Sequence, residues 1–266
     1  MNIQDIEQYA DDSRQMIRLD REYDEINLHG TQGIFRRVKR SKKEAEVTDE
    51  GKTLQGVILR VRRQLVQFNK NSDNLWTPEH FTKEDPVFLF EGKVVKDQGI
   101  AGELREKYPK LRTQQVLYVL LENGEVVRLI VKGASLGSDA KPENSIPFYE
   151  YLSQSFNRSI GEHVWKFKTS FTPVTEKGPL GSYFAISFEK GEKLEIDFIE
   201  NTIGPWIKKL FEQFKIADRK PKLDISTEDS QKHPTDQSQD TNEEIPVINL
   251  DEPLPSDDIN PKDLPF

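Results

Sequence analysis

The sequence predicts a mainly β fold of the α+β class, followed by a disordered acidic tail. Three observations lead to this prediction. Segments of strand length alternate apolar and polar residues, and an Asn-Gly pair separates two of the most apolar segments. Beyond Lys222 the chain is rich in Ser, Thr, Gln, Asp and Pro, which is too polar a composition to form a core. We therefore divide the chain into an N-terminal arm (residues 1–50), a β-rich body (51–222) and a tail (223–266).

The N-terminal arm alternates charges without a firm period, although apolar residues between Ile3 and Leu19 allow a marginal helix. Residues 35–43 place six cations in nine positions. Such a run is either a solvated loop or a flexible basic segment on a phosphate backbone. Because the tail is acidic, we favour the second interpretation. The residues expected to contact phosphates are Arg36, Arg37, Lys39 and Arg40.

Residues 57–68 alternate with a period of two, which is typical of a strand with one buried face. One face holds Val57, Leu59, Val61 and Leu65. The other face holds Ile58, Arg60, Arg62, Gln64, Val66 and Phe68. We expect a half-buried strand with a cationic outer face. Prolines at 78 and 86 interrupt the chain, and residues 87–90 and 94–95 then predict two further short strands.

The firmest structural prediction is a hairpin over residues 115–132, with Asn123-Gly124 as a two-residue type I′ turn. That turn pairs Glu122 with Glu125, Leu120 with Val127, Tyr118 with Leu129, and Val116 with Val131. Because this face is apolar, Tyr118 is expected in the core. The opposite face is mixed and includes Arg128 and Lys132. It either lines a cationic groove or lies beneath a helix, with the cations at the margin.

Two amphipathic helices and a second hairpin complete the body. Residues 146–156 and 205–214 repeat apolar side chains every three or four positions. Residues 164–171 and 183–188 predict paired strands, with residues 172–182 as a mobile finger. The first strand has Trp165, Phe167 and Phe171 on one face, and Lys166 and Lys168 on the other. These elements best fit an antiparallel barrel with insertions and a closing helix, and an OB-like (oligonucleotide-binding) Greek-key barrel is the first choice.

No catalytic or metal-binding motif is recognisable in the sequence. The chain has no cysteine, its four histidines stand far apart, and the phosphate-loop, nucleophile-elbow, zinc-protease and dinucleotide fingerprints are missing. No apolar run reaches the ~20 residues of a membrane span, and the first residues lack a signal-peptide pattern. We therefore expect a non-enzymatic protein of a reducing cytoplasm, with neither cofactor nor metal.

Charge separates the tail from the rest of the chain. Residues 224–266 carry twelve acidic residues and two lysines, a net charge of −10, whereas residues 1–223 carry 34 acidic and 36 basic residues, a net charge of +2. The tail ends in a phenylalanine, whose ring and carboxylate together suit a basic pocket on a partner. The acidic residues before it would raise the encounter rate with such a partner.

This ending resembles the C-terminus of bacterial single-stranded DNA-binding proteins. In that family a disordered acidic stretch ends in Asp-Asp-Ile-Pro-Phe, and replication, repair and recombination proteins bind the tip. About the last ten residues carry the resemblance, with Leu264 in place of Ile and Lys262 in place of the adjoining acid. The resemblance implies a partner-docking role for Asp263, Leu264, Pro265 and Phe266. The body does not resemble the bacterial protein in detail and is more like divergent proteins of phages and mobile elements.

These observations predict sequence-independent binding of single-stranded DNA in replication, recombination or repair. Such proteins combine cations for phosphates with aromatic platforms for bases. The phosphate candidates in the body are Arg60, Arg62, Arg128, Lys132, Lys166 and Lys168. The stacking candidates are Phe68, Trp76, Phe81 and Trp165. One alternative is a β-rich adaptor of a replication or transcription complex that does not touch DNA. Another is a nucleic-acid enzyme, which would need an acid cluster that only the fold could reveal.

Overall fold

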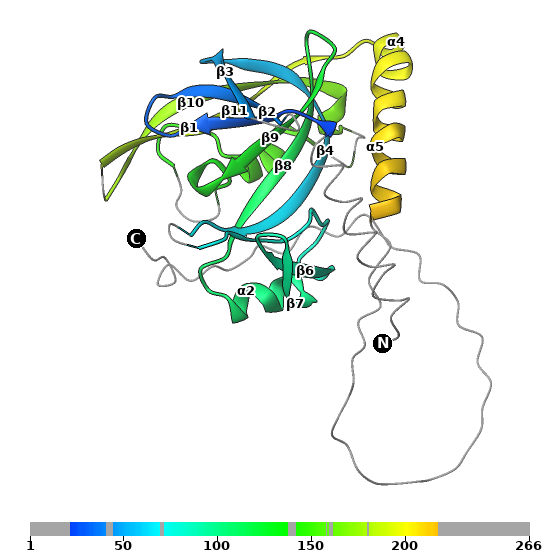
Figure 1. Ribbon diagram of the computed structural model, residues 1–266. Helices are drawn as coiled ribbons and strands as arrows, with labels where there is room; N and C mark the ends of the chain where they lie inside the picture. The colour runs from blue at the N-terminus through cyan, green and yellow to red at the C-terminus, as the bar shows by residue number, and fades with distance from the viewer. Residues whose placement is uncertain are drawn as a thin grey trace, which may run out of the picture. The chain divides into compact units, whose positions relative to one another are not determined.

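The computed structural model describes residues 22–40, 45–69, 72–137, 142–157, 159, 162–179 and 181–217. These residues form a mainly β fold, in which short helices pack on one open mixed sheet of eleven strands (Figure 1). The strands are β1 (Glu25–His29), β2 (Ile34–Arg40), β3 (Ala45–Gly51), β4 (Leu54–Gln67), β5 (Leu75–Trp76), β6 (Pro86–Glu91), β7 (Val94–Ile100), β8 (Arg112–Leu121), β9 (Val126–Lys132), β10 (Phe167–Gly178) and β11 (Gly181–Lys193). The helical segments are α2 (Ala101–Lys107), η1 (Gly133–Ser135), α3 (Phe148–Ser155), η3 (Val164–Lys166), α4 (Ile196–Phe198), η4 (Ile199–Ile203) and α5 (Gly204–Ala217).

The strand order is β3-β2-β1-β9-β8-β4-β5-β6-β7, and β10 joins the first residues of β4 to β11. β1 and β9 run parallel, and the other described pairs are antiparallel. The Phe184 amide donates to the Gly30 carbonyl at 3.0 Å, so β11 touches the β1–β2 turn, but the described strands form no ladder there. The expected mainly β fold is confirmed. The expected OB-like barrel is not, because the sheet does not close.

Residues 35–40 of the basic segment belong to strand β2 rather than to the flexible arm that we expected, and residues 41–43 lie outside the described residues. β2 pairs with β1 on one side and β3 on the other. Phe35 is fully buried and Arg37 is only 6% exposed. An arginine at a buried strand position hides the apolar alternation by which strands are recognised. The helix expected between residues 3 and 19 lies outside the described residues.

β4 contains a bulge that changes which side chains share a face. Ile58 pairs with Val119 and Arg60 with Tyr118, so Leu59 is an extra residue in the ladder with β8. Such a residue reverses the alternation of the strand. Consequently Arg60 and Arg62 lie on the same side as Val57, under α5. The expected cationic outer face of this strand is wrong, since Arg62 is 1% exposed.

The β8–β9 hairpin is confirmed, but its register differs by one residue from the prediction. The Gly124 amide donates to the Leu121 carbonyl at 3.0 Å, and the Leu121 amide donates to the Glu125 carbonyl at 2.8 Å. The loop therefore has three residues, with the positive φ of 83° at Gly124. Tyr118 faces Arg128 instead of Leu129. Its expected place in the core is confirmed by an exposure of 1%.

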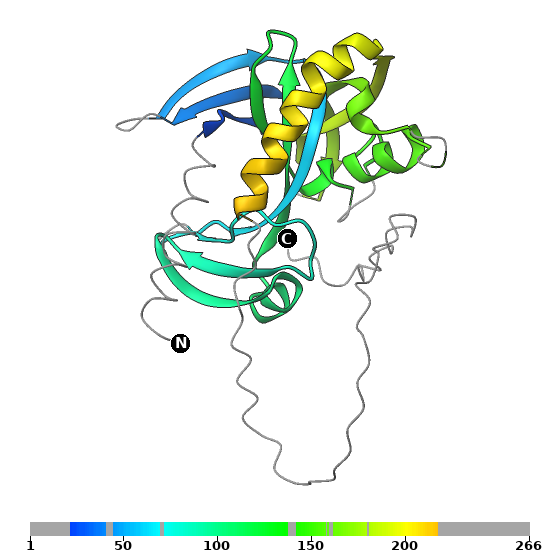
Figure 2. The same cartoon turned by 90° about the vertical axis from the view of Figure 1, so that its right-hand side faces the viewer.

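Three apolar clusters hold the described part of the chain together. The largest lies between the sheet, α3 and the β10–β11 hairpin, and the second lies beneath α5, which runs across β4 in Figure 2. The third belongs to the β5–β6–β7–α2 segment, which is inserted between β4 and β8. Both predicted helices are present. In α5 Leu210 and Phe214 are buried as expected, whereas α3 buries Phe148 and Tyr151 and leaves the preceding Ile146 43% exposed.

The second hairpin is longer than predicted. Residues 172–178, expected in a mobile finger, continue β10 and pair with residues 181–187 of β11. The start of the hairpin is the short 3₁₀ turn η3, so Trp165 and Phe167 do not share a strand face. Trp165 packs in the cluster beneath α5, and Phe167 packs in the cluster beside α3. No helix in the described part of the chain is long and apolar enough to cross a bilayer.

Candidate nucleic-acid interface

Arg60 and Arg62 lie beneath the C-terminal helix α5. The Cζ atoms of Arg60 and Arg62 lie 4.9 and 4.6 Å from the centroid of the Phe214 ring. Arg62 also donates through Nη2 to the Glu79 carbonyl at 3.0 Å. In this conformation the two guanidinium groups stack on an aromatic ring of the protein itself, a favourable cation–π arrangement when desolvated.

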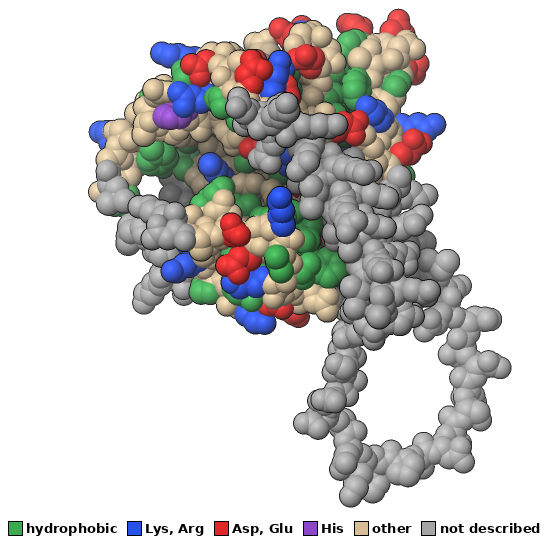
Figure 3. Space-filling view, in the orientation of Figure 1, with side chains coloured by type: hydrophobic (Ala, Val, Ile, Leu, Met, Phe, Trp, Pro, Cys, Tyr) green, Lys and Arg blue, Asp and Glu red, His purple; other side chains and the backbone are tan. Residues whose placement is uncertain are grey.

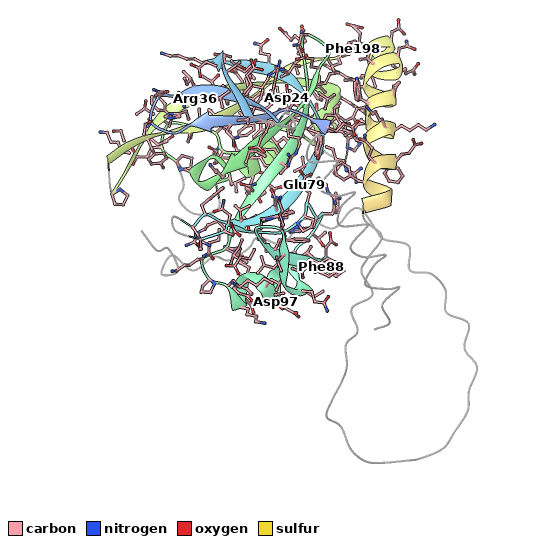
Figure 4. All side chains as sticks on the ribbon, in the orientation of Figure 1. Asp24, Arg36, Glu79, Phe88, Asp97 and Phe198 are labelled. Atoms are coloured by element: carbon pink, nitrogen blue, oxygen red, sulfur yellow. The ribbon has the colours of Figure 1, made fainter. Side chains whose placement is uncertain are left out.

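Arg128 is part of a buried charge network centred on Glu79. In Figure 4, Glu79 lies between the central strands of the sheet and the strands β6 and β7. Arg128 is 3% exposed and its Nη2 lies 2.6 Å from Glu79 Oε1. The Tyr118 hydroxyl donates to Glu79 Oε2 at 2.8 Å, and Arg128 also lies 3.7 Å from Glu25. Paired and hydrogen-bonded in this way, a buried cation can be held within a protein core.

The cations of β2 are largely neutralised by neighbouring carboxylates. Arg37 pairs with Asp24, Glu50 and Glu125 at 3.5, 2.7 and 2.7 Å. The hydrogen bond from Arg37 lowers the pKa of the Glu125 carboxyl. Arg36 pairs with Asp49 at 3.1 Å. Lys39 is exposed, and the side chain of Arg40 lies outside the described residues.

The candidates of η3 and β10, and Trp76, also have partners within the protein. Lys168 pairs with Glu192 at 2.6 Å, and that hydrogen bond raises the pKa of Lys168. Trp165 stacks on His163 with 5.6 Å between ring centroids, and Lys166 lies 5.2 Å from the Trp165 ring. Trp76 stacks on Phe90 at 4.6 Å, and its indole N–H donates to the Gly92 carbonyl at 2.8 Å.

Phe68 and Lys132, in contrast, lie at an open hollow. Phe68 follows the last residue of β4 and is 69% exposed, and Lys132 Nζ lies 5.6 Å from the centroid of its ring. The hollow has a volume of about 530 Å³ and brings two further cations, Lys110 and Arg112, to the same place. The described residues that line it are Val66, Gln67, Phe68, Asn69, Lys110, Arg112, Thr113, Gln114, Lys132 and Gly133. These described residues include three cations, three side-chain amides and no carboxylate.

The strand register explains how the hollow forms. Arg112 opposes Val66 in the β4–β8 ladder, and Gln114 opposes Lys132 in the β8–β9 ladder. The end of β4, the start of β8 and the end of β9 therefore meet at one place. Sequence analysis found Phe68 and Lys132 but missed Lys110 and Arg112, which precede and begin an apolar strand. The β4–β8 register, had it been known, would have placed Arg112 beside Phe68.

A second exposed phenylalanine lies away from the hollow. Phe81, which is 61% exposed, follows His80 in the loop after β5. His80 exchanges two backbone hydrogen bonds of 2.8 Å with Arg63 and is 4% exposed. Burial lowers the pKa of the His80 imidazole to about 4, so this side chain is neutral at physiological pH. It anchors the loop against β4 as an uncharged group.

The charge distribution elsewhere is mixed. On the face drawn in Figure 3, acidic and basic side chains are interspersed. The described residues contain no group of three or more His, Asp or Glu side chains placed to hold a metal ion. The expected docking tip, residues 263–266, lies outside the described residues. Comparison with protein-family models, curated proteins and solved structures finds no match to this chain.

Proposed function

We propose that this chain binds single-stranded DNA without sequence preference, and that the hollow at Phe68 is where the strand is held. The observation that supports this proposal is an exposed aromatic ring among three cations, with no carboxylate among the described residues that line the hollow. Aromatic platforms beside cationic grooves are the usual way to bind unpaired strands, because every base has a face that can stack. Arg112, Lys110 and Lys132 would contact phosphates, and the face of Phe68 away from Lys132 would stack on a base.

The same geometry favours unpaired over paired strands. Bases in a duplex are stacked on one another, so a protruding ring cannot reach their faces without unstacking them. Phosphates, in contrast, are available in both forms. Phe68 should therefore contribute to single-strand affinity and contribute little to duplex affinity, whereas the cations contribute to both.

We further propose that the strands around the largest core derive from an OB-like barrel that has opened. Support comes from the Phe184–Gly30 hydrogen bond, which brings β11 to the β1–β2 turn where a closed barrel would have its last ladder. In the cell we propose a role in replication, recombination or repair, with partners recruited through Asp263, Leu264, Pro265 and Phe266. The sequence of the tail supports that part of the proposal.

Fluorescence anisotropy with labelled oligo-dT and a matched duplex tests the site. Phe68→Ala should weaken single-strand binding by roughly 5- to 150-fold, which corresponds to one lost stacking contact of ~1–3 kcal/mol. Duplex binding should change little. Phe81→Ala is the matched control, because Phe81 is equally exposed but does not line the hollow.

Loss of affinity in Phe81→Ala with none in Phe68→Ala would place the strand elsewhere. If the wild-type chain binds no oligonucleotide at low salt, the adaptor alternative is preferred.

A further inference from the structure

Two of the three end strands of the described sheet, β3 and β7, expose apolar side chains that a lone domain would be expected to cover. Three valines are largely exposed among the described residues, and all three lie on these end strands. Val47 on β3 is 56% exposed, and Val94 and Val95 on β7 are 70% and 49% exposed. Among the described strands, β3 pairs with β2 alone and β7 with β6 alone, and they lie at opposite ends of the sheet in Figure 1.

The charges that flank these valines are opposite in sign and equal in spacing. On β3, Glu46 and Asp49 flank the pair Val47-Thr48. Lys93, in the turn before β7, and Lys96, at the bulge of β7 against β6, flank the pair Val94-Val95. Glu46 and Lys93 are exposed. Asp49 and Lys96 make surface ion pairs with Arg36 and Glu91 at 3.1 and 3.0 Å. Exposed pairs of this kind are weak and readily exchanged for another partner.

We propose that β3 of one copy of this chain pairs with β7 of the next copy as antiparallel neighbouring strands. Directly opposed residues in an antiparallel ladder share a face, so each pair is in contact. The proposed register places Glu46 opposite Lys96, Val47 opposite Val95, Thr48 opposite Val94, and Asp49 opposite Lys93. Two ion pairs thus enclose two pairs of β-branched side chains, and the unpaired backbone groups of both edges gain partners.

The same charges oppose pairing between identical edges. A two-fold β3–β3 contact in the corresponding register places Glu46 opposite Asp49, and a β7–β7 contact places Lys93 opposite Lys96. Like charges directly opposite each other destabilise a ladder. These charges therefore favour pairing of β3 with β7 over pairing of either strand with its own copy. A contact between two different surfaces leaves one surface of each kind free in a dimer and can therefore repeat from copy to copy. Copies bound to one strand of nucleic acid would then lie in a row and bind cooperatively.

Cysteine pairing tests the contact directly, because the natural chain has no cysteine. Chains carrying Val47→Cys are mixed with chains carrying Val95→Cys and oxidised. The mixture should give a mixed disulfide dimer in at least tenfold excess over either homodimer, since these residues are directly opposed in the proposed register. As the register control, Val94→Cys takes the place of Val95→Cys in the mixture. The yield of the mixed disulfide dimer should then be at least tenfold lower. Equal yields, predominant homodimers or no dimer at all would overturn the proposal.

Charge exchange provides a second, independent test by sedimentation of the purified chain at low salt. Lys93→Glu with Lys96→Glu gives a chain with two acidic edges, and Glu46→Lys with Asp49→Lys gives a chain with two basic edges. Each should remain monomeric under conditions in which the wild type assembles, whereas an equimolar mixture should assemble again. Circular dichroism verifies that both variants are folded. A mixture that remains monomeric, or a wild type that is monomeric at every concentration, would overturn the proposal.

Discussion

Tyr118 and Arg128 face each other across the β8–β9 ladder and donate to different oxygens of one carboxylate, that of Glu79. The Glu79 side chain is 5% exposed and comes from the segment between β5 and β6. This carboxylate therefore ties the inserted segment to the central strands and balances a cation that is buried beneath α5. The sequence alone gave no reason to single it out.

Removing this carboxylate should destabilise the protein strongly. Glu79→Ala leaves Arg128 buried without its closest partner, and breaking a buried pair from one side typically costs ~3–5 kcal/mol. Urea unfolding followed by circular dichroism measures the loss. Glu192→Ala is the matched control, because Glu192 pairs with Lys168 at the surface and is 70% exposed, and it should leave the free energy of unfolding nearly unchanged. Equal losses in the two variants would show that the Glu79 network does not hold the sheet together.

The stability of the protein should depend on pH through His80. Its pKa is lowered to about 4 in the folded state, against an ordinary value of 6.5. Between these values the unfolded chain takes up a proton that the folded chain does not, so stability is fully present above pH 6.5 and falls as the pH drops towards 4. The loss over this window should be about 3 kcal/mol.

His80→Gln should remove this part of the acid sensitivity, as measured by urea unfolding at a series of pH values. His163→Gln, a change at an exposed histidine, should retain the wild-type profile. If the His80→Gln and wild-type curves stay parallel from pH 7 to pH 4, the imidazole is not the titrating group.

The cations of the hollow should determine the salt dependence of strand binding. Each phosphate contact with a single strand contributes ~0.7 to the slope of log K against log salt. Replacing Lys110, Arg112 and Lys132 by alanine should therefore reduce the slope by up to about 2. Alanine at the exposed lysines 52, 177 and 208 makes the same change in net charge outside the hollow and should leave the slope nearly unchanged. Equal slopes for the two triple variants would show that Lys110, Arg112 and Lys132 do not contact the bound strand.

The tip should act in partner docking alone. Deleting residues 263–266 should abolish capture of a replication or repair partner and leave urea unfolding unchanged, because the polar composition of the tail is unsuited to forming a core. Lys262→Asp restores the acid found at that place in bacterial single-stranded DNA-binding proteins, and should strengthen capture. Pull-down with full-length, truncated and Lys262→Asp bait, read by mass spectrometry, compares the three. A Phe266→Ala bait that captures the same partners would contradict the docking role.

Sequence patterns predicted the elements well where apolar periodicity was clean, as in β8, β9 and α5. They did not predict which residues share a face. The bulge at Leu59 and the third loop residue in the β8–β9 hairpin each shift a register by one, and neither has a local signal strong enough to compete with the simpler pattern. β2 was not recognised in the sequence because it buries a charged residue, Arg37. The carboxylates that compensate this charge are those of Asp24, Glu50 and Glu125, and Glu125 lies far from Arg37 in the sequence. The hollow depends on the same long-range registers, so only Phe68 and Lys132 were found in advance.

The meeting of Val66 with Arg112 has a mechanical consequence. Because these residues oppose each other in the β4–β8 ladder, the chain enters and leaves the inserted segment beside one ladder pair. Phe68 lies on the departing chain and Lys110 on the returning chain, whereas Lys132 belongs to the sheet itself. The backbone hydrogen bonds between Arg63 and His80 and between Leu65 and Thr77 fix the inserted segment along β4. The wall of the hollow that carries Phe68 is thus braced by the same strand that continues the sheet into β5, β6 and β7.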